Sequence, residues 1–255
     1  NPRASIGELV AFPLKVHGFD RDQLDDRVGD LLEAVGLHRN HASYYPHQLS
    51  GGQRQRVNIA RAVALDPKLV VCDEAVSALD KSVQAQVLEL LLDLRSERGL
   101  TYLFISHDLN VVEYMSDVVI VMYLGQAVES CTADELYANP RHPYTQALLS
   151  SIPSMRPRED AGIQLDGELP SPLDPPPGCR FQTRCPEVMP VCRTEVPVPV
   201  SLAPGHQVAC HLYESAEPTP VELTPTGTDE AGPDTGTGAL PSTEPDAPQP
   251  ANQEH

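Results

Sequence analysis

The sequence has no long apolar run, no amino-terminal signal peptide and little positive charge. Its longest apolar stretch, Val118 to Leu124, is far shorter than the roughly 20 residues that a membrane-spanning helix needs. Because no signal peptide opens the chain, we expect a cytoplasmic location. The formal net charge of −18 argues against nucleic-acid binding, which requires cationic side chains to neutralise phosphates.

Proline and charge are distributed unevenly over the 255 residues. From residue 155 to 213 the sequence is rich in proline, contains cysteine and has little periodicity, so we expect a loop-rich region there. From Ser215 onward there is no Lys or Arg, and the acidic residues are Glu217, Glu222, Asp229, Glu230, Asp234, Glu244, Asp246 and Glu254. Low hydrophobicity and charge of one sign predict a disordered tail over residues 214–255.

Before residue 155, alternating strand and helix patterns predict an α/β fold with a mainly parallel sheet. Residues 1–48 are predicted to be helical. The elements expected after them are a helix capped by Ser50, a strand over 69–73, a helix over 82–98, a strand over 102–106, a helix over 109–115, a strand pair over 118–123 and 126–129, and helices over 132–139 and 144–151.

Ser50, Gly51 and Gly52 open a predicted helix. Exposed backbone N–H groups, a hydroxyl and the positive end of the helix dipole together make an anion site. Glycine at these positions lets a phosphate approach the backbone closely. If these three residues stood alone, an ordinary capped helix would be the favoured explanation.

Asp73 and Glu74 end a predicted apolar strand, and His107 follows another. Adjacent carboxylates at a strand end suit magnesium binding and general-base catalysis. Each feature alone is also common as a polar strand end, and a single histidine there is more often structural than catalytic.

These segments occur in a specific order. Leu49 to Gln53 reads Leu-Ser-Gly-Gly-Gln; Asp73-Glu74, the segment 77–80 (Ser-Ala-Leu-Asp) and the segment 106–108 (Ser-His-Asp) follow. Together they resemble the second half of an ABC-type ATPase. The resemblance implies a P-loop NTPase fold, with a partial helical subdomain over 1–48 and the carboxy-terminal half of the catalytic core over 49–154.

The resemblance also implies a role for each motif. Glu74 would be the general base and His107 the switch histidine that touches the γ-phosphate and positions water. Asp73 would hold Mg²⁺ through water, and Asp80 lies in the loop that contacts a second ATPase subunit. The residues that would contact the γ-phosphate of ATP held by that second subunit are Ser50, Gly51, Gly52 and Gln53.

Two features depart from the complete family pattern. The chain contains no Gly-x-x-x-x-Gly-Lys-Ser/Thr loop, which cradles the nucleotide phosphates in P-loop ATPases. Ala75 also stands where the family usually has proline. Because the phosphate-binding loop is missing, we expect a carboxy-terminal portion of an ATPase that by itself binds ATP weakly and hydrolyses none, and the start at Asn1 fits this expectation.

A more specific resemblance lies downstream. Residues 139–149 read Asn-Pro-Arg-His-Pro-Tyr-Thr-Gln-Ala-Leu-Leu, which is similar to a segment of oligopeptide and dipeptide importer ATPases. This similarity implies a carboxy-terminal region of that subfamily over 155–213 and a role in peptide import. The implied partners are a second ATPase subunit (identical or paralogous), transmembrane permease subunits and, indirectly, a substrate-binding protein. The implied location is the inner face of the cell membrane.

Four cysteines lie in the proline-rich region: Cys179, Cys185, Cys192 and Cys210. Four thiolates in a loop-rich segment can hold a metal and so order a region that has no core of its own. Zinc sites favour C-x2–4-C pairs, which are absent here, so an iron–sulfur cluster fits somewhat better than zinc. In some members of the subfamily this cysteine pattern is linked to a four-iron cluster. Free thiols are the remaining alternative.

Two other functions are consistent with parts of the sequence. The first is a chromosome-maintenance or repair ATPase, which shares the signature but carries coiled-coil arms and basic DNA surfaces that are absent here. The second is a non-catalytic fragment that uses its cysteines as a metal or redox module. Metal content without ATPase activity would favour the second.

Overall fold

A computed structural model describes residues 1–152, 163, 165, 167, 168 and 170–213. The tail over 214–255, which we expected to be disordered, lies outside the described residues. No helix in the described part is both long enough and apolar enough to cross a membrane.

The amino-terminal region is helical, as predicted. It consists of α1 (Ile6–Val16), α2 (Arg21–Ala34), two short 3-10 helices (Arg39–Ser43 and Pro46–Gln48) and α3 (Gly51–Ala62). A capping box at Ser5 and Glu8 starts α1. Gly36 follows α2 with φ +71°, a conformation that favours glycine over other residues. Buried apolar residues of α1, α2 and α3 belong to one hydrophobic core with those of α4.

Strands β1 (Leu69–Asp73) and β2 (Thr101–Ile105) pair in parallel, with Leu69 opposite Thr101 and Asp73 opposite Ile105. Helix α4 (Lys81–Arg98) connects them and ends at Gly99, which has φ +62°. Because the pair is parallel and in register, the carboxyl ends of both strands lie at the same edge. This edge carries the loops that follow Asp73 and Ile105.

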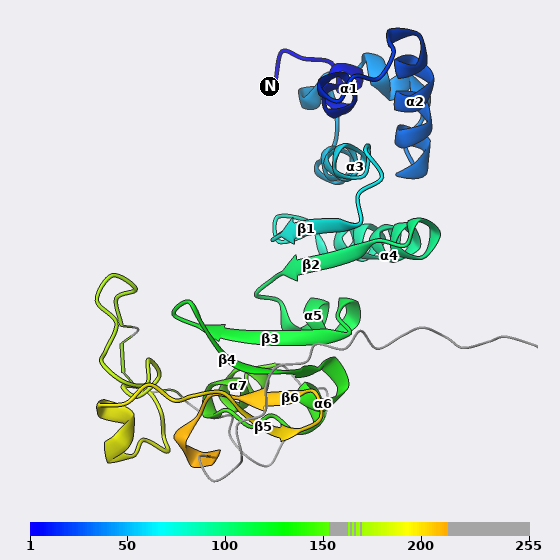
Figure 1. Ribbon diagram of the computed structural model, residues 1–255. Coiled ribbons are helices and arrows are strands. Elements are labelled where there is room, and N and C mark those ends of the chain that lie inside the picture. The colour runs from blue at the N-terminus through cyan, green and yellow to red at the C-terminus, as the bar shows by residue number, and fades with distance from the viewer. Residues whose placement is uncertain (153–162, 164, 166, 169, 214–255) are drawn as a thin grey trace, which may run out of the picture. The chain divides into compact units, whose positions relative to one another are not determined.

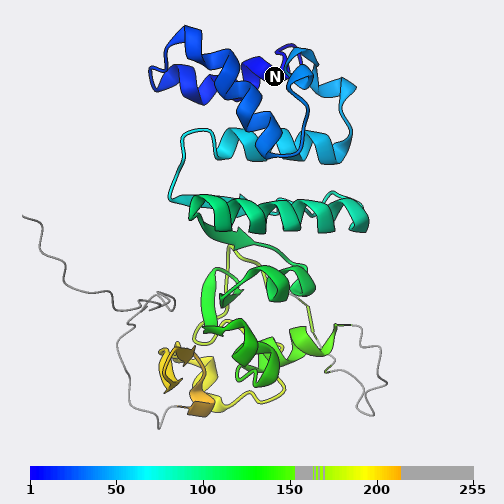
Figure 2. The same ribbon diagram turned by 90° about the vertical axis from the view of Figure 1, so that its right-hand side faces the viewer.

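The two faces of this strand pair differ. Val70 and Cys72 are buried in the core that includes α4, and the hydroxyl of Tyr102 donates to the carbonyl of Leu91 on α4, at 2.9 Å. Figures 1 and 2 show α4 alongside the pair. The other face is apolar yet open, with side chains 47 to 57% exposed at Leu69, Val71, Leu103 and Ile105.

The second sheet is antiparallel, with strand order β3-β4-β6-β5. Its strands are β3 (Val118–Tyr123), β4 (Gln126–Thr132), β5 (Val200–Ala203) and β6 (His206–Val208). The helices along this part of the chain are α5 (Leu109–Met115), α6 (Ala133–Ala138) and α7 (Pro143–Ser150), followed by 3-10 turns at Pro190–Arg193 and His211–Tyr213.

The prediction of a mainly parallel sheet therefore holds for β1 and β2, whereas the other four described strands pair antiparallel. The reason is that tight turns at Gly125 (φ +78°) and Gly205 (φ +76°) join neighbouring strands directly, and a two-strand hairpin is antiparallel. Strands β5 and β6 were not predicted. The expected strand 126–129 extends to Thr132.

Candidate functional site

The start of α3 is built by a capping box. The Ser50 hydroxyl accepts a hydrogen bond from the Gln53 backbone N–H at 3.2 Å, and the Gln53 side-chain oxygen accepts one from the Ser50 backbone N–H at 2.9 Å. The box does not use the N–H groups of Gly51 and Gly52 in the first turn. The helix therefore presents backbone donors and its positive dipole end at an exposed position, which suits an anion.

Gly52 also lies against α4. A Cβ added at this position would come within 2.5 Å of a methyl carbon of Val83, and one added at Gly51 would come within 3.8 Å of a Leu79 methyl carbon. The absence of a side chain thus brings the start of α3 close to α4 and to the segment 77–80. Asp80 occupies the N-cap position of α4 without a side-chain cap bond, so its exposed carboxylate is not used in capping that helix.

Glu74 and His107 lie together at the carboxyl edge of the β1–β2 pair. Nδ1 of His107 is 3.1 Å from a carboxylate oxygen of Glu74, and both side chains are more than half exposed. The backbone N–H of Glu74 donates to Ile105 at 2.9 Å, which extends the strand pairing by one residue. At such an exposed edge, the carboxylate can accept a proton from a water molecule while the imidazole orients that water molecule.

Glu74 has φ +45°, a left-handed conformation that a residue with a side chain adopts at a cost. The Ser77 hydroxyl donates to the Glu74 carbonyl at 3.0 Å and supports this turn. Backbone strain of this kind is often found at functional sites. The turn directs the chain away from β1 immediately after Asp73, whose side chain lies at the exposed end of the strand.

Asp108 connects this edge to α4. Its carboxylate accepts hydrogen bonds from Lys81 Nζ at 2.7 Å, from the Gln84 amide at 3.5 Å and from the Asn110 backbone N–H at 3.2 Å, the last of which caps α5. The Lys81 ammonium is the main cause that lowers the pKa of Asp108 to about 2. The residues next to Asp80 and His107 are thus joined by an ion pair, which the sequence did not predict.

The predicted site residues fall into two groups in the described part of the chain. One group surrounds Glu74 and His107 at the strand edge, and the other is the Ser50–Gln53 turn with Leu79 beside it. No hydrogen bond or ion pair described for Ser50 or Gln53 reaches Glu74 or His107. In the described part of the chain, the two groups are thus not joined by a hydrogen bond or an ion pair.

The four cysteines of the proline-rich region are free thiols. The Cys179 backbone N–H donates to the Cys192 carbonyl at 2.9 Å. Burial raises the pKa of Cys185 and of Cys210 to about 11, and the neighbouring thiols contribute to both shifts. Among the described residues, however, no three of these sulfurs lie within 4.8 Å of one another.

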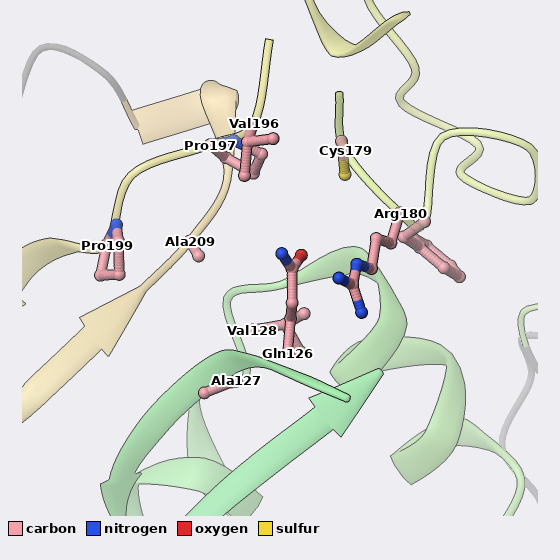
Figure 3. Close-up of a pocket in the computed structure, with 10 residues that line it drawn as sticks. Gln126, Ala127, Val128, Cys179, Arg180, Val196, Pro197, Pro199 and Ala209 are labelled. Carbon is pink, nitrogen blue, oxygen red and sulfur yellow. The ribbon is translucent and has the colours of Figure 1, made fainter. Parts of the chain in front are cut away.

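A cavity of about 260 Å³ lies beside this segment and the start of β4. Cys179, Arg180 and Gln126 line one side of it, and Pro197, Pro199 and Ala209 line the other (Figure 3). The Arg180 guanidinium donates to the carbonyl of Leu124 in the β3–β4 turn, so the cysteine segment is anchored on the antiparallel sheet.

No sequence pattern indicated the role of Glu129. This buried carboxylate on β4 accepts hydrogen bonds from the backbone N–H groups of Arg141 and His142, at 2.8 and 2.9 Å, and lies 2.8 Å from Nε2 of His206 on β6. His142 in turn caps α7 by accepting from the Tyr144 backbone N–H, and burial lowers the pKa of this histidine to about 4. The segment 139–149 is thus held against the sheet by one carboxylate.

Residues 1–77 match the family described as ABC transporter, and residues 128–192 match the family described as oligopeptide/dipeptide transporter, C-terminal region.

The chain is 52% identical to the oligopeptide transport ATP-binding protein AppF of Bacillus subtilis (strain 168), over 84% of this chain and 66% of AppF. It is also 52% identical to the putative oligopeptide transport ATP-binding protein YkfD of the same strain, over 85% of this chain and 68% of YkfD. The dipeptide transport ATP-binding protein DppF of Escherichia coli (strain K12) is 48% identical, over 85% and 65%. The chain spans about two thirds of the length of these relatives. From the identity, the coverage and the two family matches, the chain belongs to the ABC transporter ATP-binding proteins of the oligopeptide/dipeptide type.

Proposed function

We propose that this chain is part of an ATP-binding subunit that energises peptide import. It provides the residues for ATP hydrolysis at the carboxyl edge of β1 and β2, and the start of α3 that contacts ATP. The observation that carries the proposal is the contact between Glu74 and His107 at the carboxyl edge of β1 and β2. Glu74 acts as the general base toward the attacking water, and His107 positions that water and touches the γ-phosphate. Asp73 holds Mg²⁺ through water.

The Ser50–Gln53 turn and the Glu74–His107 pair share no described hydrogen bond or ion pair, which supports a dimer in which each of them contacts a different ATP. The Ser50–Gln53 turn serves ATP held by a second ATPase subunit, while Glu74 and His107 serve ATP held on their own side. Asp80, exposed and without a capping bond, contacts the second subunit. Closure of such a dimer around ATP drives permease subunits at the inner face of the membrane. The relatives' names indicate oligopeptides or dipeptides as the transported class.

The open apolar face of the β1–β2 pair guides the design of a test. We join this chain to a segment carrying the Gly-x-x-x-x-Gly-Lys-Ser/Thr loop of an ABC transporter ATPase, so that this segment covers Leu69, Val71 and Ile105. Magnesium-dependent ATP turnover is then measured for the chimera and for its Glu74→Gln variant. Turnover is expected to fall by about 100-fold or more in the variant, the usual contribution of a general base, with ATP binding retained.

Glu89→Gln supplies a matched control, because Glu89 is an exposed carboxylate on α4. This variant is expected to turn over at the rate of the unmodified chimera. If Glu74→Gln matched that rate as well, the role of Glu74 as base would be refuted. If the unmodified chimera bound ATP but never hydrolysed it, the chain would be a binding half-site only.

For the region over 155–213 we propose an extension whose four thiols hold an iron–sulfur cluster. A single zinc ion, about 2.3 Å from each sulfur, would require the sulfurs to lie within about 4 Å of one another. No three of the described thiols meet this requirement, although they influence one another's pKa values, which fits a larger group better. Iron and acid-labile sulfide are measured in anaerobically purified protein and in Cys192→Ser. Equal content in both would exclude the cluster.

A further inference from the structure

A second group of potential metal ligands lies outside the cysteine segment. It comprises Glu129 and Cys131 on β4 and His206 on β6, whose ligand atoms all lie within 4.8 Å of one another. The strand register explains this proximity. Ser130 pairs with Gln207, so Cys131 lies beside His206 across the antiparallel pair, and Glu129 shares a face of β4 with Cys131. All three residues are at least 97% buried.

The charge of this group is not balanced by Lys or Arg in the described part of the chain. His206 lies between two carboxylates: Nε2 is 2.8 Å from Glu129, and Nδ1 is 3.5 Å from Glu135 on α6. The Glu129 side chain is fully buried, whereas that of Glu135 is 38% exposed and reaches solvent. A buried carboxylate is costly unless it is compensated, and a divalent cation bound by Glu129 would compensate it in place of a proton on His206.

Cys131 adds a soft ligand to the group. Its sulfur lies within 4.8 Å of the ligand atoms of Glu129 and His206, and the residue is 1% exposed. A cysteine that coordinates a cation does so as the thiolate, and its proton goes to solvent. Thiolate, imidazole and carboxylate are the three ligand types that zinc takes from proteins.

Glu135 has the position of an orienting group. Histidines that bind a metal usually donate their second ring N–H to a carboxylate, which fixes the tautomer. With Nε2 of His206 directed to the metal, Nδ1–H faces Glu135. Glu135 is itself held by the Asn139 side-chain amide at 3.3 Å.

We propose that Glu129, Cys131 and His206 form a zinc site that joins β4 to β6. The site is independent of the ATPase motifs and of the four cysteines of the proline-rich region. The zinc ion would link the β5–β6 hairpin to β4, the strand whose Glu129 accepts hydrogen bonds from the segment 139–149.

The test uses the whole chain, stripped with chelator under reducing conditions and dialysed against buffered Zn²⁺. Bound zinc is counted by mass spectrometry for the unmodified protein, Cys131→Ala, Cys72→Ala and Cys192→Ala. Cys72 is a buried cysteine in β1 and serves as the matched control, while Cys192 reports on the other cysteine segment. We expect Cys131→Ala to lose one equivalent of zinc that Cys72→Ala and Cys192→Ala retain.

A second measurement keeps the proposal testable if a variant is unstable. Co²⁺ replaces Zn²⁺, and the absorption band from thiolate-to-cobalt charge transfer is recorded for the same proteins and for His206→Gln, each checked by circular dichroism. The band of Cys192→Ala should lose the contribution of Cys131 when Cys131→Ala is added to it. If that band does not change, or if zinc uptake is the same in Cys131→Ala as in the unmodified protein, the site does not exist and Glu129 and His206 form only a hydrogen bond.

Discussion

Glu74–His107 and Glu129–His206 are the same chemical pair in two opposite environments. In the first pair the atoms are 3.1 Å apart and the side chains are 54 and 73% exposed; in the second they are 2.8 Å apart and the side chains are 0 and 4% exposed. An exposed pair contributes little to stability and remains open to water or a ligand. A buried pair must be satisfied by its own fold, so its loss is costly. Exposure thus separates groups that work on a substrate from groups that hold the fold together.

This contrast would be refuted if removing the carboxylate of Glu74 or that of Glu129 lowered the free energy of unfolding by the same amount. We expect Glu129→Ala to lower the free energy of unfolding by about 3–5 kcal/mol, because it leaves His206 and the backbone N–H groups of Arg141 and His142 buried without an acceptor. Glu74→Ala should change it by less than about 0.5 kcal/mol. Urea denaturation with chelator present measures both variants free of metal effects. Similar losses in the two would refute the role given to burial.

The contrast between buried and exposed positions can also be tested at two glycines, one of which lies in the cysteine segment. Gly178 has φ +70°, and a Cβ there would come within 2.5 Å of the Cys192 carbonyl oxygen. Gly205 has φ +76° with nothing within 4 Å. Gly205→Ala should therefore cost about 1 kcal/mol for the left-handed backbone, and Gly178→Ala about 1–3 kcal/mol more for the clash. Thermal unfolding compares the pair, and equal costs would contradict the close approach at Gly178.

The exposed region offers a smaller, pH-dependent effect. The pKa of Asp108 is about 2 in the folded protein, against an ordinary value of 3.8, so its ion pair stabilises the fold above pH 4 and this contribution disappears as the pH falls through 2. Lys81 is 82% exposed, which limits the contribution to about 1 kcal/mol or less. Lys81→Met should be less stable than the unmodified protein at pH 7 and equal to it near pH 2. Lys15→Met, on the exposed side of α1, should show no such convergence in urea titrations across this range.

The smallest expected effect has the opposite sign. Glu74 pays for its left-handed backbone, whereas glycine adopts that conformation freely but loses more entropy on folding. Glu74→Gly should therefore raise the free energy of unfolding by about 0.5–1 kcal/mol while the ATPase chimera loses turnover. Glu89→Gly in the middle of α4 should lower it by about 1 kcal/mol. Destabilisation by both glycines would show that the turn at Glu74 is not strained.

The elements that the sequence predicted are those fixed by local chemistry. Ser50 is the N-cap of α3 as predicted, α4 ends at the predicted Arg98 before Gly99, and β1 has its expected bounds, because each depends on residues close in the chain. Glu74 and His107 were predicted at the ends of two strands, and the structure brings them together because the two strands are parallel neighbours that end at one edge.

The features that the sequence did not reveal depend on distant contacts. The turn Pro204-Gly205 between two short apolar runs was the available signal for β5 and β6, but runs of three or four residues in a proline-rich region do not distinguish strand from loop. Nothing near Glu129 indicates that its hydrogen-bond partner lies 77 residues away at His206. Buried polar partnerships of this kind are set by tertiary packing, which local patterns do not encode.

The position of β6 in the sheet also determines the order in which the sheet forms during folding. Strands β3 and β4 form a local hairpin, but β4 gains its second neighbour only after the chain has reached Val208. Contacts between segments so far apart require a large loop to close, and such contacts form late in folding. During synthesis on a ribosome, helices α1 to α4 and the β1–β2 pair emerge first. Glu129 emerges before His206, its hydrogen-bond partner on β6. The carboxy-terminal hairpin thus acts as the last step of assembly, and synthesis that stops before it leaves one edge of β4 open to pairing with another chain.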